Sequence, residues 1–88
     1  MNSPYGVERA RVFTARVLYS LNVALYVARA KDPGTPPSWD DLLDRDQAGW
    51  MDLVDRAVAG FLPNDDLHGQ VAQAVYANFL AAFGDCDA

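Results

Sequence analysis

The strongest constraint on this chain is a run of twelve residues, 17–28, without a single charged side chain. Apolar residues in and before this run recur at steps of three and four, which is the period of a helix and not of a strand. The run is also too short to cross a membrane, which takes about 20 apolar residues. We therefore expect one long helix over residues 5–30. Its predicted core stripe is Ala10, Phe13, Val17, Leu21, Ala24 and Ala28.

The opposite side of this helix is almost as apolar. A surface helix normally keeps one polar face, so a helix that is apolar nearly all round needs more than one covering partner. We expect residues 17–28 to be central in the fold, or to be covered in part by a second copy of the chain. The apolar residues of this second side are Val12, Tyr19, Val23, Tyr26 and Val27.

The remaining sequence predicts shorter helices separated by clear breaks. Three prolines and a glycine within residues 31–37 stop the first helix. Ser38 and Asp41 have the spacing of a capping box, which predicts a short helix over 39–44. Helical spacing returns over 46–61, with Asp44 or Asp46 as the cap, and over 66–83.

The expected fold class is therefore all-α, a compact bundle of three main helices and one short helix. With 88 residues the chain forms a single domain, and residues 85–88 are expected to fray. The predicted inward stripes are Trp50, Leu53, Val54, Ala57, Val58 and Phe61 on the helix 46–61, and Leu67, Val71, Ala74, Val75, Asn78, Phe79, Ala82 and Phe83 on the helix 66–83.

The net charge of −5 is divided unevenly along the chain. Residues 1–31 hold five basic residues and one glutamate, a balance of +4, whereas residues 32–88 hold two arginines and eleven aspartates, a balance of −9. Nucleic-acid binding requires basic residues against phosphate, so the acidic part disfavours it. The acidic surface either keeps the protein in solution or meets a basic partner.

The sequence contains few residues of the kinds that catalyse reactions or bind metals. The chain has one histidine, His68, and one cysteine, Cys86, so zinc ligation, a Cys–His pair and an internal disulfide are all disfavoured. We expect no cofactor, no metal and no enzymatic activity. The start of the sequence has no signal-peptide pattern and we expect no membrane association, which together favour the cytoplasm, or the host cytoplasm if a phage encodes the chain.

Aromatic residues and arginines are the usual anchors of protein interfaces. Arg9 and Arg16 lie seven residues apart, on one side of the first helix. A protein partner is therefore expected, and a homodimer is the simplest way to cover the first helix. The candidate partner or oligomer surface is Arg9, Arg16, Tyr19, Val23 and Tyr26.

Two segments resemble a known family. Residues 15–17 (Ala-Arg-Val), Asn22 and Ala24 precede a proline-rich turn into Pro-Ser-Trp-Asp-Asp-Leu at 37–42. This pattern resembles the small ryanodine-receptor-type helical domains of bacteriophages, over about residues 15–54. Tyr19 and Ser20 stand where that family has a His–Glu pair. The resemblance implies a helical fold and a ligand or partner surface near Asn22 and Trp39, to which we add Trp50.

The sequence thus favours a non-enzymatic interaction module, expected to be a phage accessory protein that binds a host or phage protein. The alternatives are a small-ligand domain of the ryanodine-receptor type and a structural component of the virion.

Overall fold

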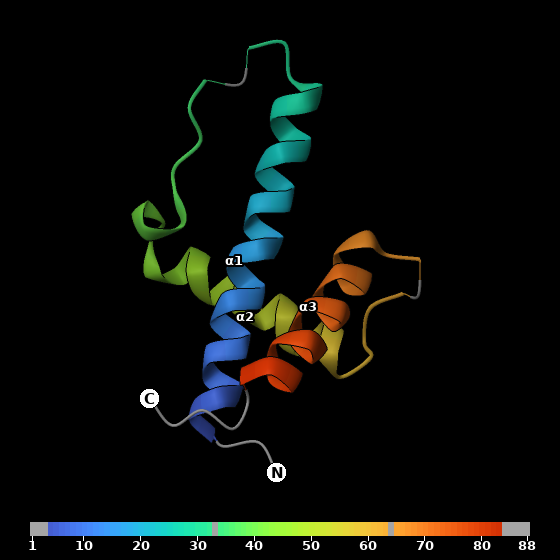
Figure 1. Ribbon diagram of the computed structural model, residues 1–88. Coiled ribbons are helices and arrows are strands. Elements are labelled where there is room, and N and C mark those ends of the chain that lie inside the picture. Colours follow the sequence, from blue (N-terminus) through green and yellow to red (C-terminus); the bar gives the residue numbers. More distant parts are fainter. Residues whose placement is uncertain (1–3, 33, 64, 84–88) are drawn as a thin grey trace.

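A computed structural model describes residues 4–32, 34–63 and 65–83 of the chain. The described residues are mostly helical and contain no strand, and each α-helix packs against the other two (Figure 1). The predicted all-α bundle of three main helices is therefore confirmed. In chain order its elements are α1 (Pro4–Arg29), the short 3-10 helix η1 (Trp39–Asp41), α2 (Asp44–Val58) and α3 (Leu67–Phe83). The tail at 85–88 lies outside the described residues.

The second main helix is shorter than predicted at its C-terminal end. It ends at Val58 because Gly60 adopts a left-handed backbone conformation, with φ at 83°, and reverses the chain. The backbone N–H of Phe61 then donates to the carbonyl of Arg56 at 2.9 Å, a bond typical of a glycine-terminated helix. Phe61 consequently lies outside the helix and is 79% exposed.

The helix starts agree only in part with the predicted caps. Asp66 accepts a hydrogen bond from the N–H of Gly69 at 3.1 Å, as expected of a residue that caps α3. The predicted capping box at Ser38 is wrong, because its hydroxyl donates to the Asp41 carboxylate at 2.9 Å and caps no backbone group. Likewise α2 begins at Asp44, and its N-cap position is occupied by Leu43, which makes no side-chain cap.

The centre of the bundle is built mainly from small side chains. Among the residues that the structure describes, one cluster is fully buried: Ala15, Leu18, Val54, Ala57 and Ala72. Three of these five are alanines, one from each helix, and a side chain of that size lets helix backbones approach closely. Larger side chains border this centre without being enclosed by it, namely Trp39, Trp50, Met51, Leu53, Leu62, Val71 and Tyr76.

The predicted core stripe of α1 is wrong for most of its residues. Of that stripe only Ala10 is buried, and the buried face continues through Thr14 and Leu18. Phe13 is 46% exposed because the face that α2 and α3 approach is formed by smaller side chains beside it. Val17 and Leu21 are half-buried, and Ala24 and Ala28 are exposed.

The other two stripes are also only partly buried. On α2, Val54 and Ala57 are buried, whereas Val58 is exposed. On α3 the buried residues are Gly69 and Ala72, where a Cβ on Gly69 would lie only 3.3 Å from that of Leu62. The residues of the predicted α3 stripe that are exposed instead are Leu67, Ala74, Asn78, Ala82 and Phe83.

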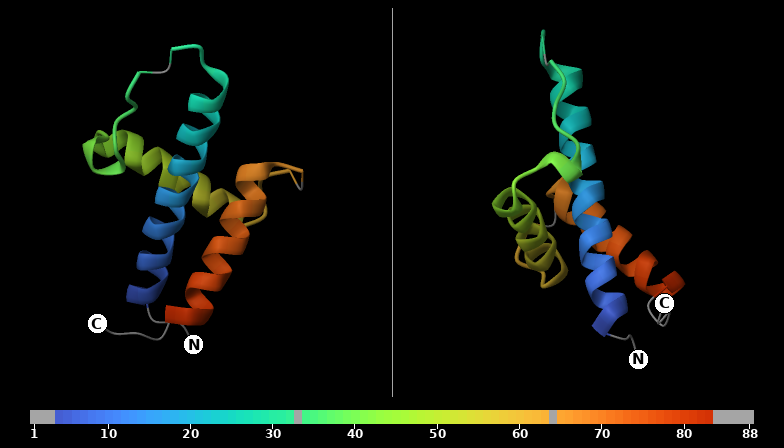
Figure 2. Two further views of the ribbon diagram at one scale, coloured as in Figure 1. Left: turned by 45° about the horizontal axis from the view of Figure 1, so that its top comes forward. Right: turned by 90° about the vertical axis from the view of Figure 1, so that its left-hand side faces the viewer.

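The second half of α1 extends beyond the other two helices, and the described parts of the segment 30–38 run back from its tip towards η1 (Figures 1 and 2). Ala24, Tyr26 and Val27 are all exposed there, and Val23 and Leu25 are half-buried. The expectation that residues 17–28 are central in the fold is therefore wrong for this half. The other expectation, that a second copy covers it, stays a prediction.

A charged group ties the first half of α1 to α2. Arg11 donates through Nε and Nη2 to the two carboxylate oxygens of Asp55, both at 2.8 Å, and through Nη1 to Glu8 at 2.8 Å. The hydrogen bonds to Asp55 and then to Glu8 raise the pKa of Arg11 above its ordinary value. Since all three groups are partly exposed, we expect this pair to orient the helices more than to stabilise them.

Thr14 provides a test of the core. Its side chain is fully buried, and its hydroxyl makes no hydrogen bond within the described part of the chain. We expect Thr14→Val to raise the free energy of unfolding by about 1 kcal/mol, because a methyl group has no hydrogen bond to lose on burial. Denaturant unfolding measures this. Thr35→Val, the same change at an exposed position, should leave the stability unchanged. A loss of stability in Thr14→Val would show that the hydroxyl is satisfied.

Candidate interaction site

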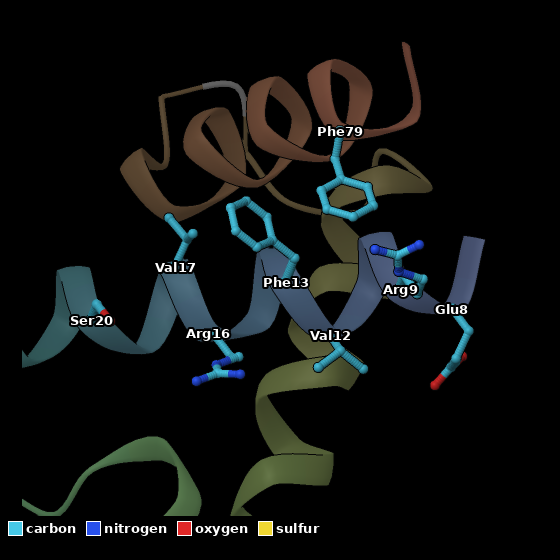
Figure 3. Close-up of a pocket in the computed structure, with 8 residues that line it drawn as sticks. All are labelled: Glu8, Arg9, Val12, Phe13, Arg16, Val17, Ser20 and Phe79. Carbon is cyan, nitrogen blue, oxygen red and sulfur yellow. The ribbon is translucent and has the colours of Figure 1, made fainter. Parts of the chain in front are cut away.

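An open groove with a volume of about 680 Å³ lies along the outer side of α1, next to α3 (Figure 3). Phe13 and Val17 of α1 and Phe79 of α3 point towards one another there, with the two phenylalanine ring centres 5.1 Å apart. The groove exists because α1 turns its small residues to the core, which leaves this larger ring outside. Its lining residues are Glu8, Arg9, Val12, Phe13, Arg16, Val17, Ser20 and Phe79.

A second hollow of about 380 Å³ continues the groove along α3. It shares Phe13 and Phe79 with the first and adds Phe83, whose ring centre lies 5.2 Å from that of Phe79. Phe83 is 49% exposed. We call the surface formed by Phe13, Val17, Phe79 and Phe83 the aromatic groove. Contiguous exposed apolar surface of this kind is typical of interaction sites.

Two arginines flank the aromatic groove. The guanidinium carbon of Arg9 lies 6.0 Å from the ring centre of Phe79, within the range of a cation–π contact. Arg16 is exposed, and like Arg9 it lines the groove. Seven residues of helix separate the two along α1, about 10 Å. The structure therefore brings together two of the five residues predicted for a partner surface.

The other three lie elsewhere. Tyr19 is 9% exposed, and its hydroxyl donates a hydrogen bond to the carbonyl of Pro37, so this side chain holds the segment 30–38 against α1. Val23 is half-buried, and Tyr26 is 52% exposed, both on the protruding half of α1.

The residues implied by the family resemblance separate in a similar way. Trp39 and Trp50 pack around Tyr19, with ring centres 6.1 Å and 5.7 Å from it. Trp50 also lines a separate hollow on α2. Asn22 is exposed, and neither it nor Trp39 lines the aromatic groove. Both tryptophans thus pack against the core cluster and the ring of Tyr19.

Within the described ranges, no three His, Cys, Asp or Glu side chains come together as metal ligands would. The Nδ1 atom of His68 lies 4.0 Å from a carboxylate oxygen of Asp66, and its ring centre lies 6.4 Å from that of Trp50, with the two rings tilted by 33°. Cys86 lies outside the described residues. In that same part of the chain, no helix has both the length and the apolar character needed to span a membrane.

Comparison with known proteins gives no relative from which to transfer a function. No protein-family model, no curated protein and no solved structure matches this chain. The resemblance to ryanodine-receptor-type domains therefore stays a prediction, and a function has to be inferred from the geometry.

The sequence assigned the phenylalanines of the groove to the core. The sequence does contain a sign of their actual position, because α1 is apolar on more than one face. A helix in a three-helix bundle buries one face against its two neighbours, so a second apolar face stays at the surface. Ala10, Thr14 and Leu18 form the face that the fold buries, and Phe13 belongs to the other.

The different settings of two tyrosines on α1 give a matched test. Tyr19→Phe should lower the free energy of unfolding by about 1 kcal/mol, because the carbonyl of Pro37 loses its donor in a partly buried place. Tyr26→Phe, at an exposed position, should have no effect. Thermal unfolding followed by tryptophan fluorescence measures both. Equal stability of the two variants would show that the hydroxyl of Tyr19 does not hold the segment 30–38.

Proposed function

We propose that this chain is a non-enzymatic protein-interaction module that binds a helical segment of a protein partner in the aromatic groove. The observation that carries this proposal is that the described residues leave the outer apolar side of α1 only partly covered, beside the half-buried Phe79 and the exposed Phe83 of α3. If a phage encodes the chain, as the sequence resemblance implies, the partner is a host or phage protein in the host cytoplasm.

The shape of the groove favours a helix as the partner. It runs along α1 from Glu8 to Ser20, which is about 18 Å of helix axis, and is open on its outer side. An amphipathic helix inserts side chains at steps of three and four into such a groove. Phe13 and Phe79 provide the large apolar contact at its centre, and Arg9 adds a charged group of the kind common in interface anchors.

Photo-crosslinking tests this proposal. With p-benzoylphenylalanine in place of Phe13, we expect a discrete covalent adduct in cells that produce the chain naturally, and mass spectrometry should map it to an amphipathic helix. The matched control replaces Phe61, an exposed phenylalanine outside the aromatic groove. The same substitution there should give no discrete adduct.

Two results would contradict the proposal. One is the absence of an adduct at position 13 although the variant is folded by circular dichroism. The other is an adduct of the same protein at position 61 in equal yield, which would mean that any exposed apolar side chain captures it.

A further inference from the structure

The aromatic groove and the protruding half of α1 lie on the same face of one helix. Residues Phe13, Val17, Ser20, Ala24 and Val27 follow one another at steps of four and three, the spacing at which two helices pack side by side. We call these five residues the outer stripe. The fold covers none of them fully, since Phe13, Ser20, Ala24 and Val27 are exposed and Val17 is half-buried.

From this arrangement we propose that the segment in the aromatic groove is the protruding half of α1 from a second copy of this chain. The two α1 helices run antiparallel about a two-fold axis that lies between the helices, at the height along α1 midway between residues 18 and 19. Each copy then places its protruding half in the groove of the other. This inference rests on the proposed function and names its partner.

Side-chain size favours this pairing. The outer stripe is large at its first residue, Phe13, and small over Ser20 and Ala24. Antiparallel pairing about that axis sets Phe13 level with Ala24 of the second copy, and Val17 level with Ser20 of the second copy. A larger side chain then meets a smaller one at both of these levels, which is the condition for close helix packing.

The same two-fold axis brings α3 into the interface. Leu21 and Ala28 flank the outer stripe on the side of α1 where α3 lies, and a two-fold axis keeps that side in common for both copies. The half-buried Leu21 and the exposed Ala28 of the second copy therefore fall over the phenylalanines of α3. These phenylalanines, Phe79 and Phe83, extend the row that begins at Phe13.

Charge selects the antiparallel direction. A parallel pair would set Arg9 against Arg9 and Arg16 against Arg16, which is repulsive. In the antiparallel pair Arg16 is level with the uncharged Leu21 of the second copy. Arg9 is level with Ala28, near the C-terminal end of α1, where the helix dipole favours a cation. The basic Arg29 in that same turn is level with the acidic Glu8.

Molar mass in solution gives the first test. By sedimentation equilibrium at high micromolar concentration we expect a dimer. Ala24→Arg should weaken it by on the order of a hundredfold, because the new charge is buried against Phe13 of the second copy. Ala48→Arg, the same change at an exposed position of α2, should leave it intact. A monomeric wild type, or equal dimers from both variants, would overturn the inference.

Disulfide trapping gives the second test and reads the direction of the helices. Chains with Cys86→Ser and Val17→Cys are mixed with chains carrying Cys86→Ser and Ser20→Cys. The antiparallel pair predicts disulfides between the two variants, faster than within the Val17→Cys variant alone. Faster coupling of the Val17→Cys chains to one another is the result for a parallel pair and would contradict the inference.

The outcomes separate this inference from the function on which it rests. A monomeric wild type whose position 13 crosslinks to a helix of a different protein overturns the second copy as partner and leaves the groove a binding site. A failure to crosslink at position 13 to any protein, in a chain that is also monomeric, overturns both.

Discussion

The contact on which the rest of this structure depends is the close approach of three helices at Ala15, Ala57 and Ala72. One buried alanine from each helix lets the backbones come together, with Leu18 and Val54 beside them. A centre made of such small side chains has no space for an aromatic ring. The larger apolar residues are consequently displaced to its border or to the surface, and the exposed phenylalanines of α1 and α3 follow from the size of the core.

The length of α1 adds to this effect. Its 26 residues extend past both partner helices, so only its first half has two neighbours (Figure 1). The segment 30–38 covers part of the second half through Tyr19 and Pro37, but the residues beyond Tyr19 stay half-buried or exposed. A helix of this length with an apolar circumference is costly to leave in water. The presence of such a helix in the fold therefore favours a partner that covers its exposed apolar residues.

The sequence predicts which segments form helices, but it does not predict which face of each helix is buried. Period and breaks predicted three main helices because proline, glycine and the three-to-four spacing act locally. The orientation of each helix depends on which of its faces the other helices approach, and that is a tertiary choice. Hydrophobicity alone favoured Phe13 over Thr14 for the core, whereas close packing favoured the smaller side chain.

The site shows the same limit. Arg9 and Arg16 were identified from their spacing on one helix, and this spacing is local, so it persists in the fold. Phe79 and Phe83 could not be joined to them, because their position beside α1 depends on the turn of the chain at Gly60 and the cap at Asp66. The spacing of two residues on one helix could be predicted, whereas contacts between elements needed the structure.

Small size links the fold and the binding of a partner. A chain of 88 residues can bury only a modest core. Three of the five residues in the buried cluster of this chain are alanines. Whatever binds only the folded chain stabilises it by mass action. An occupant of the aromatic groove would contact α1 and α3 together and would oppose their separation. The face that the described residues leave partly uncovered is thus also the face through which a partner would most increase the stability of the bundle.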